Sequence, residues 1–342
     1  MGYKKIKKDQ LNTFLSELSK DYTVVLPSRS GGQVVFGPWD GENTDFLDWY
    51  KNTVIPPKAL FFPPVEEMFR FRKGEEGYEI QELMPDKGQQ IIFGIRPCDA
   101  RALKIIDMLF ADTYRDPYYL RRRENSLLIG LGCNEPCDTC FCASLDISPG
   151  QSEDVDILCT DVSDNLLIEA ISEKGSNLLS GMSGLSDAGS EEESKAKELR
   201  KSAKERIARE INLSGLQEKM RSNFENREYW EKVSKKCMAC GICTYVCPTC
   251  HCFDINDENR KKEGKRVRSW DSCKFPLFTR MPMENPRHEK WRRMRQRYHH
   301  KFEYYPMNFG AIACTGCGRC IRECPVNVDV TEIIGGISRT LV

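Results

Sequence analysis

The sequence predicts an α+β protein, in which an N-terminal α/β domain with a βαβ unit precedes an α-helical domain that carries two matching cysteine motifs. Three observations lead to this prediction. Two short apolar runs flank a helical pattern before residue 132, residues 174–193 are rich in Gly, Ser and acidic side chains, and the C-terminal third holds two four-cysteine runs of equal spacing. We therefore expect an α/β domain over residues 1–175, a linker with a solvated helix over 176–225, and the cysteine-rich domain over 226–342.

The first domain opens with a short amphipathic helix near residues 11–18, followed by the strands "YTVVLP" and "GQVVFGPW". In the βαβ unit, "QIIFGI" and "SLLIGLG" are the strands and "DARALKIIDMLF" is the helix, with Asp99 as its expected N-cap. A right-handed crossover between parallel strands brings their carboxyl ends to one edge of the sheet, so Cys98 and Cys133, which follow those ends, are expected to be neighbours. A further strand, "VDILCT", and a helix, "SDNLLIEAIS", are expected to extend the sheet, and Cys159 in that strand is read as a buried apolar side chain.

The segment between the two domains has two parts. Residues 174–193 contain too little apolar surface to pack, which indicates a mobile connection. After it, Leu199, Ala203, Ile207 and Ile211 recur at helical spacing. This spacing predicts a solvated helix that leads into the second domain.

Composition excludes several classes of protein. Lysine plus arginine equals aspartate plus glutamate at 51 each, so the overall charge gives no support for a nucleic-acid partner. No stretch approaches the roughly 20 apolar residues of a membrane helix, and no apolar run follows the basic start "MGYKKIKKDQ". A chain of 342 residues buries its cores without disulfides, so its 17 cysteines indicate metal binding. We expect a cytoplasmic protein with no direct membrane insertion.

The two cysteine motifs are bacterial ferredoxin runs. "CMACGICTYVCP" and "CTGCGRCIRECP" both have the spacing C-x2-C-x2-C-x3-C-P, in which the fourth cysteine binds the other of two clusters. The proline after each fourth cysteine turns the chain and directs that thiolate away from its own loop. The sequence therefore predicts two 4Fe-4S clusters with crossed ligands. The first takes Cys237, Cys240, Cys243 and Cys324, and the second takes Cys314, Cys317, Cys320 and Cys247.

Zinc also binds four cysteines, but zinc modules use two C-x2-C pairs and not two complete four-cysteine runs ending in proline. The long insertion between the motifs contains the run "PRHEKWRRMRQRYHHKFEYY", which is helical in pattern and strongly basic. Its charges, Lys290, Arg292, Arg293, Arg295, Arg297 and Lys301, first suggest a solvated helix. Cations beside an anionic thiolate cluster or a docking surface for an acidic partner are the other interpretations, and nucleic-acid binding ranks last.

A third group of cysteines lies in "GLGCNEPCDTCFCASL". Cys133, Cys137, Cys140 and Cys142 fall within ten residues, and Cys98 is expected to join them at the edge of the sheet. Buried reduced thiols and a catalytic dithiol are alternatives, but only metal ligation needs this many thiolates in one place. Four ligands suffice, so a third 4Fe-4S cluster leaves one of the five spare.

The residues now described resemble the β-subunit family of soluble sulfhydrogenases, which also includes the A subunit of anaerobic sulfite reductase. The resemblance rests on "GIRPCDARAL", "RDPYYLRRR", "GLGCNEPCDTCFCAS", "CGICTYVCPTCHCFD", "RSWDSC", "NPRHEKWRRMRQRYHHKF" and "CTGCGRCIRECPVNVDV". It implies that Cys98, Cys133, Cys140 and Cys142 hold the third cluster and that Cys137 is the spare thiol. It also implies a relay between a flavin subunit that handles NAD(P)H and a catalytic subunit such as a nickel-iron hydrogenase or a sulfite-reducing haem protein.

The sequence supports an electron-transfer subunit without a catalytic site of its own. No G-x-G-x-x-G fingerprint follows a strand, and no acid, base or nucleophile constellation is readable, so no catalytic or dinucleotide-binding residue is assigned. The partners expected are an NAD(P)H/flavin subunit, a catalytic subunit of hydrogenase, sulfite, sulfur or heterodisulfide reductase type, and a ferredoxin. As the alternative, the N-terminal cysteine site itself reduces a sulfur compound or a disulfide. Cys250, Cys252 and Cys273 receive no role from the sequence.

Overall fold

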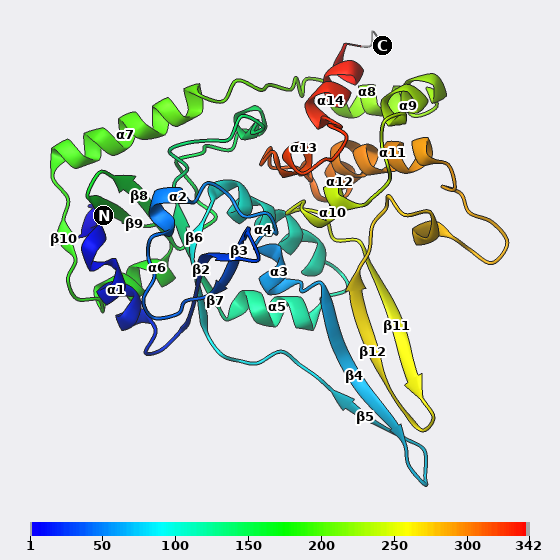
Figure 1. Cartoon of the computed structure of the whole chain (residues 1–342), viewed down its shortest axis with the longest axis horizontal. Coiled ribbons are helices and arrows are strands. Elements are labelled where there is room, and N and C mark those ends of the chain that lie inside the picture. Colours follow the sequence, from blue (N-terminus) through cyan, green and yellow to red (C-terminus); the bar gives the residue numbers. More distant parts are fainter. Residues whose placement is uncertain (1, 340–342) are drawn as a thin grey trace.

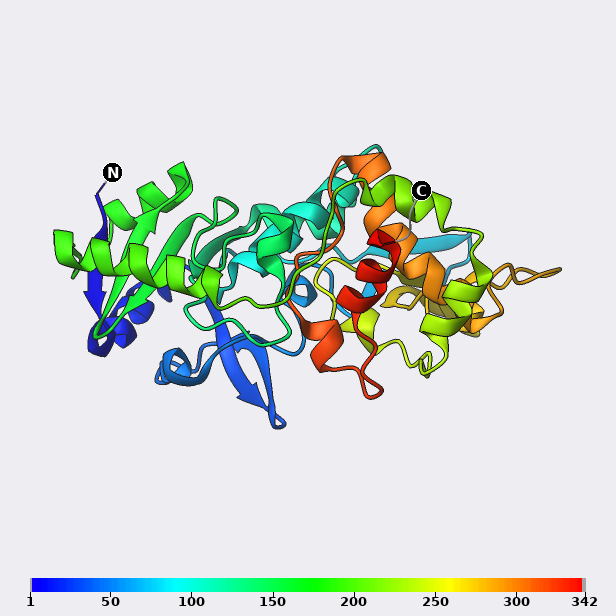
Figure 2. The same cartoon turned by 90° about the horizontal axis from the view of Figure 1, so that it is seen from above.

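The computed structural model describes residues 2–339 and contains two sheets and a helical region (Figure 1). The larger sheet has eight strands in the order β10-β1-β9-β8-β7-β6-β2-β3, and the smaller has four in the order β11-β12-β4-β5. The large sheet and the helical C-terminal region lie at opposite ends of the long axis, as Figure 2 shows from above. The protein thus mixes helix and sheet, as predicted.

The centre of the large sheet is parallel and its flanks are antiparallel. Strands β2, β6, β7 and β8 run parallel, whereas β3, β9, β1 and β10 pair antiparallel with their neighbours. The strands are β1 (Lys4–Lys7), β2 (Thr23–Ser30), β3 (Gln33–Pro38), β6 (Gln90–Ile95), β7 (Ser126–Leu131), β8 (Ile157–Val162), β9 (Asn165–Ala170) and β10 (Ser186–Asp187). The predicted βαβ unit is confirmed, because β6 and β7 are parallel neighbours joined through a helix.

Helices cover both faces of this sheet because alternate strand residues point to opposite sides. Ile91 and Phe93 of β6 pack on one face with α1 (Leu11–Leu18), and Ile92 packs on the other with α4 (Pro97–Phe110). The second face also receives α3 (Lys58–Phe61) and α5 (Pro117–Glu124), while α6 (Glu173–Ser180) joins α1 and α2 (Phe46–Trp49) on the first. The central strands β6 and β7 are therefore apolar and buried along most of their length.

Two local predictions in this domain are wrong. The segment "SDNLLIEAIS" forms strand β9 and not a helix. Leu166 and Ile168 are buried on one face of the sheet and Leu167 on the other. Asp99 is not the N-cap of α4: Arg96 occupies that position, and Pro97 starts the helix. Asp99 lies in the first turn, where its carboxylate has another partner described below.

The predicted connecting segment is largely structured. It contains α6, β10 and the helix α7 (Ser190–Glu205), which packs against β8 and β9 through Ala196 and Ala203. The predicted helix is confirmed through Leu199 and Ala203, but it ends at Glu205, so Ile207 and Ile211 lie beyond it. The buried Arg200 on its inner face donates hydrogen bonds to Thr160 and Glu169 of the sheet, so one side of the helix is not solvated.

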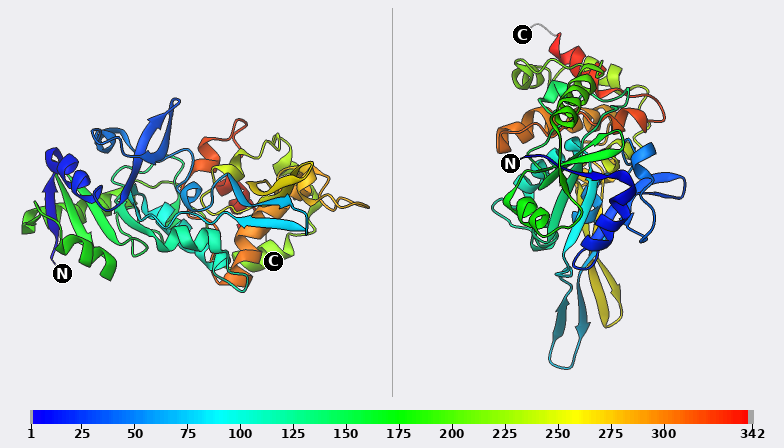
Figure 3. Two further views of the ribbon diagram at one scale, coloured as in Figure 1. Left: turned by 90° about the horizontal axis from the view of Figure 1, so that it is seen from below. Right: turned by 90° about the vertical axis from the view of Figure 1, so that its left-hand side faces the viewer.

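The small sheet is an arm that projects from the body, as Figures 1 and 3 show. Strands β4 (Val65–Lys73) and β5 (Tyr78–Glu82) form one hairpin, and β11 (Phe253–Arg260) and β12 (Glu263–Trp270) form another, joined by antiparallel pairing of β12 with β4. The second hairpin lies inside the insertion between the ferredoxin motifs, so the domain predicted as α-helical over residues 226–342 also contains two strands. Strand β12 of this hairpin pairs with β4, which lies about 190 residues earlier in the chain, and local sequence does not reveal such a partner.

The C-terminal region packs helices around Trp230, which is fully buried. These helices are α8 (Leu216–Ser222), α9 (Arg227–Ser234), α11 (Lys290–His299) and α14 (Val330–Ser338), with the short α10 (Ile242–Tyr245) and α13 (Arg319–Arg322) inside the cysteine motifs. A further helix, α12 (Tyr305–Phe309), packs on Ile105 of α4. The predicted helix in the basic run is confirmed as α11, a π-helical turn over His300–Tyr304, and α12. In the part of the chain that the structure describes, no helix is both long and apolar enough to cross a membrane.

Candidate iron-sulfur centres

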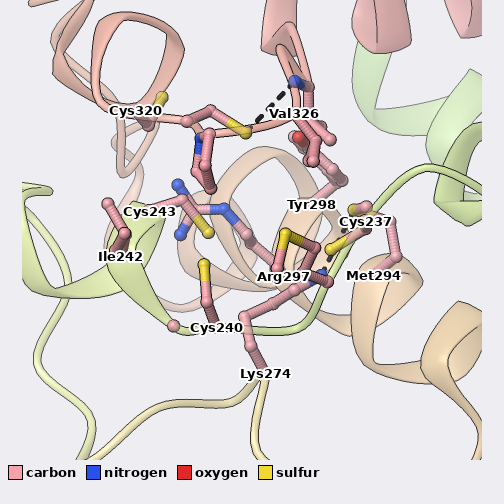
Figure 4. A pocket seen from close by; sticks show the side chains of 15 residues that line it. Cys237, Cys240, Ile242, Cys243, Lys274, Met294, Arg297, Tyr298, Cys320 and Val326 are labelled. Atoms are coloured by element: carbon pink, nitrogen blue, oxygen red, sulfur yellow. Dashed lines mark hydrogen bonds between the residues drawn. The ribbon is translucent and has the colours of Figure 1, made fainter.

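The first motif and the last cysteine of the second motif line one cavity. Cys237 and Cys240 face it from the loop before α10, Cys243 faces it from α10 itself, and Cys324 faces it from the end of the second motif. Figure 4 shows the labelled thiols of Cys237, Cys240 and Cys243 around this cavity together with Cys320 and the guanidinium of Arg297. The structure thus brings together the four residues that the sequence assigns to the first cluster.

The small residues between the ligands adopt left-handed backbone conformations. Ala239, Gly241, Gly316 and Gly318 have φ of 58°, 80°, 63° and 74°. Successive residues in such turns point their N–H groups into the concave side of the loop, where they can donate to sulfur. The N–H of Ala239 already donates to the Sγ of Cys237 at 3.3 Å, and that of Val328 to the Sγ of Cys324 at 3.2 Å.

The fourth cysteine of the first motif lies with the second motif. Cys247 is buried within electrostatic range of Cys314, Cys317 and Cys320. Burial raises the pKa of the Cys314 thiol to about 11. Metal binding requires these thiols to lose their protons, and the nearby cations favour that loss.

Two cations of the basic run are buried against these cysteines. Arg297 and Lys301 are each 4% exposed, and the Nζ of Lys301 lies 3.2 Å from the Sγ of Cys247. Arg297 lines the first cavity and donates to the Sγ of Cys250 at 3.4 Å. Lys274, 1% exposed, lines the same cavity. The interpretation of the run as a merely solvated helix is therefore wrong, and the interpretation that its cations neutralise an anionic thiolate site fits the geometry.

The N-terminal cysteines gather at the sheet edge. Cys98 is the second residue of α4, three residues after the end of β6, and Cys133 lies two residues after the end of β7. Cys98, Cys140 and Cys142 each lie within electrostatic range of Cys317 in the second ferredoxin motif, and burial is the largest cause of the raised pKa of Cys98 and Cys142, about 12 for Cys142. The fifth thiol, Cys137, is hydrogen-bonded to Cys140 and lies 3.8 Å from a guanidinium nitrogen of Arg322.

The N-terminal cysteine loop packs directly on the second ferredoxin motif. The N–H of Phe141 donates to the carbonyl of Gly316 at 2.8 Å. A Cβ on Gly316 would lie 2.5 Å from the backbone nitrogen of Cys142, and a Cβ on Gly318 would lie 2.6 Å from the carbonyl oxygen of Thr139. Two glycines thus permit a backbone contact between cysteine groups that are separated by more than 170 residues in sequence.

Sequence reasoning missed several buried polar groups around these thiols. Lys58 and Lys274 are 2% and 1% exposed, and no local pattern in the sequence marks them. Arg319, inside the second motif, is also completely buried, and a charged residue between cluster ligands is itself a signal. Within residues 2–339, no three His, Cys, Asp or Glu side chains are placed to hold one single metal ion.

Comparisons with known proteins agree with the cysteine pattern. Residues 236–328 match the model of the 4Fe-4S dicluster domain, which implies two 4Fe-4S clusters. The chain is 30% identical over 345 aligned residues to the sulfhydrogenase 2 subunit beta of Pyrococcus furiosus, and the match covers all of both chains. No solved structure matches the chain. The resemblance seen in the sequence is confirmed: this chain belongs to the sulfhydrogenase β-subunit family and is an iron-sulfur electron-transfer subunit of hydrogenase type.

Proposed function

We propose that this chain relays single electrons through three 4Fe-4S clusters. The first cluster is held by Cys237, Cys240, Cys243 and Cys324, the second by Cys314, Cys317, Cys320 and Cys247, and the third by Cys98, Cys133, Cys140 and Cys142. When bound, each cluster accepts and releases one electron. The protein holds the clusters close together, excludes water from them and balances their charge.

The observation that carries this proposal is the packing of the three thiol groups in a row. Cys320 lines the cavity of the first group while belonging to the second, and Cys317 lies near the third. The close backbone contact at Gly316 and Gly318 leaves no intervening side-chain layer between the second and third groups. Short separations favour electron transfer, so we infer the order first, second, third.

The residues around the thiols fit anionic clusters. Lys301 and Arg297 contribute buried positive charge beside Cys247 and the first cavity, and N–H groups of the ferredoxin loops supply hydrogen bonds to sulfur. Positive charge and donated hydrogen bonds stabilise the reduced, more negative state of a cluster. The two ferredoxin clusters therefore have surroundings suited to accepting electrons.

We infer two partners in a cytoplasmic, anaerobic complex. One is a subunit that binds flavin and handles NAD(P)H, and the other is a catalytic subunit of hydrogenase, sulfite, sulfur or heterodisulfide reductase type, with a ferredoxin as a further donor. The chain itself offers no glycine-rich dinucleotide fingerprint and no readable catalytic constellation. Flavin that remains bound to the isolated chain would contradict this division of labour.

Iron and acid-labile sulfide per chain test the third cluster. The protein is purified without oxygen and compared with a variant that carries both Cys98→Ala and Cys133→Ala. We expect at least about twelve iron in the natural protein and a loss of about four in the variant, counting four iron per cubane. An equal iron content in both proteins would confine the relay to the ferredoxin clusters.

The control is Cys159→Ala, which removes a buried thiol in strand β8 that has no thiol neighbour among its electrostatic partners. It should keep all its iron. Dithionite reduction followed by electron paramagnetic resonance then counts the unpaired spins. The Cys98/Cys133 variant should lose one spin and keep those of the two ferredoxin clusters.

One observation favours a second candidate function. Cys137, the thiol left over at the N-terminal site, contacts Cys140 and faces Arg322, whose side chain is 31% exposed. A disulfide bound there would take two electrons, delivered singly by the clusters, and two protons to give two thiols. A polysulfide would take the same electrons and protons to give hydrogen sulfide and a polysulfide shorter by one sulfur. Sulfide release from polysulfide by the reduced chain, abolished by Cys137→Ser with full iron retained, would support this alternative.

A further inference from the structure

Three cysteines outside the centres described above form a group of their own. Cys250 and Cys252 follow the first ferredoxin motif, and Cys273 follows strand β12. The thiols of Cys252 and Cys273 are hydrogen-bonded to each other, and Cys273 also lies within electrostatic range of Cys250. The N–H of Asp271 donates to the carbonyl of Cys252 at 2.9 Å, so the base of the β11–β12 hairpin holds the two segments together.

Buried cations surround this group without carboxylate partners. The Nζ of Lys58 lies 2.7 Å from the carbonyl oxygen of Cys250 and 4.2 Å from the centroid of the Trp270 ring, and Arg297 donates to the Sγ of Cys250. In the described part of the chain, neither Lys58 nor Arg297 forms an ion pair with a carboxylate. A buried charge without a counter-ion costs several kcal/mol. The anionic groups that lie beside these two cations are the thiolates of neighbouring cysteines.

Lys58 is the most informative of these cations. It comes from α3 in the N-terminal domain, is 2% exposed, and has Cys250, Cys247 and Cys252 as its anionic neighbours. Arg297 and Lys301 also serve the two ferredoxin centres, whereas Lys58 does not line the first cavity. Burial lowers the pKa of Lys58 to about 8 and the thiols of Cys250, Cys247 and Cys252 oppose that shift, so negative charge at Cys250 and Cys252, beside that at Cys247, would help to keep the ammonium charged.

We propose that Cys250, Cys252 and Cys273 hold a further iron-sulfur centre, a cubane with three protein thiolates. Such a centre is anionic and would offset the burial of Lys58 and Arg297, whereas a dithiol loses its charge when it is protonated or oxidised. Iron-sulfur clusters take cysteine thiolates from separated segments, here C-x-C and a distant cysteine. The fourth iron then has a ligand that is not a thiol. This inference goes beyond the three-cluster relay and does not depend on the third cluster.

The position of the centre gives it a defined place in the relay. Cys250 is hydrogen-bonded to Cys247, the crossed ligand proposed for the second cluster, and Arg297 contacts both Cys250 and the first cavity. The centre would therefore exchange electrons with the ferredoxin clusters. Cys252 directly precedes β11, so the centre would lie where the projecting arm joins the body of the protein (Figure 1).

The test is metal analysis of a variant with both Cys252→Ser and Cys273→Ser, beside the natural protein and the Cys159→Ala control. We expect about sixteen iron in the natural protein, about twelve in the double variant and no loss in the control. Controlled oxidation of the natural protein should also give the resonance signal of a three-iron cluster, because a cubane iron without a thiolate dissociates first. The double variant should lack that signal.

Three results would overturn the proposal. The first is an unchanged iron content in the double variant, the second is loss of one zinc per chain in place of iron, and the third is a Cys252–Cys273 disulfide in the anaerobic natural protein by mass spectrometry. If the double variant loses all its metal, Cys273→Ser alone is measured, and it must lose about four iron while keeping the spins of both ferredoxin clusters.

The Cys98/Cys133 variant separates this proposal from the three-cluster relay. A natural protein with about twelve iron that loses four only in the Cys98/Cys133 variant would leave the relay intact and remove the further centre. Loss only in the Cys252/Cys273 variant would do the opposite.

Discussion

Arg319 donates hydrogen bonds of 2.6 and 2.7 Å to the two carboxylate oxygens of Asp99, and both side chains are completely buried. The Nε of the same guanidinium donates to the carbonyl of Thr53 at 2.7 Å. Asp99 follows Cys98 in the first turn of α4, and Arg319 precedes Cys320 in the second ferredoxin motif. One ion pair therefore fixes the N-terminal cysteine edge against the ferredoxin loop.

Breaking this pair should be strongly destabilising. Asp99→Ala leaves the charge of Arg319 buried without a counter-ion, so we expect a loss of about 3–5 kcal/mol in the free energy of unfolding. The measurement is the denaturant midpoint of the anaerobic holoprotein, followed by the visible absorbance of the clusters. Removing both charges, as Asp99→Leu with Arg319→Met, should recover much of the loss, and a double variant as unstable as Asp99→Ala would contradict this account.

The exposed pair Lys4–Asp187 is the matched control, with side chains 46% and 83% exposed at an Nζ–Oδ1 distance of 2.7 Å. Asp187→Ala should change the stability by less than about 1 kcal/mol.

Gly318→Ala tests the contact between the cysteine groups. The new Cβ would lie 2.4 Å from the Oγ1 of Thr139 and 2.6 Å from its carbonyl oxygen, at a φ of 74°. We expect a loss of about 2–4 kcal/mol, part from the left-handed backbone and part from overpacking, with weaker retention of the N-terminal cluster. Gly310→Ala is the control, because its φ is 70° and its Cβ would meet nothing within 4 Å. Equal effects of the two substitutions on stability and iron content would contradict a functional contact.

Local patterns in the sequence predicted the parts of this fold that depend on neighbours in the chain. The βαβ unit and the helix over residues 290–299 follow from periodicity and from the handedness of crossovers. The four cysteines that the spacing assigns to the first cluster line one cavity, which Cys320 of the second motif also lines. These features need only a short stretch of chain or a topological rule.

The features that sequence reasoning missed depend on distant partners. Strand β9 reads as a helix because "NLLIEA" is apolar on both faces, and only its pairing with β8 and β1 makes it a strand. The β11–β12 hairpin needs β4, and the burial of Lys58 needs a cysteine group nearly 200 residues away. The charges of the basic run predict a solvent-exposed helix, although Arg297 and Lys301 are buried against thiols. No periodicity encodes such pairings.

Lys301→Met should lower the reduction potential of the cluster that binds Cys247. Burial lowers the pKa of Lys301 and the thiols of Cys247 and Cys250 raise it, and the net effect is a raised pKa, so the side chain stays charged. Loss of one positive charge near the cluster should shift its potential down by on the order of 100 mV, from a Coulomb energy of a few kcal/mol. A redox titration followed by electron paramagnetic resonance measures this shift.

The control for that titration is Lys290→Met at the start of the same helix, where the Nζ bonds only to the carbonyl of Lys235 at the surface. Its effect on every potential should be within error. A Lys301 variant with unchanged potentials and full iron would show that Cys247 is not a cluster ligand.

His300 should make the protein less stable as the pH falls. Burial is the main cause that lowers the pKa of His300 to about 4, with Lys301, Arg287 and Arg297 adding to it. In the unfolded chain the pKa returns to about 6.5, so between these values the unfolded state binds a proton that the folded state does not. Stability is then full above pH 6.5 and is lost progressively as the pH falls toward 4.

We test this with His300→Gln. Between pH 7 and 5.5 the free energy of unfolding of this variant should fall by about 1 kcal/mol less than that of the natural protein, measured from denaturant midpoints at equal iron content. Parallel pH profiles of the two proteins would mean that His300 is protonated as readily in the folded state as in the unfolded one.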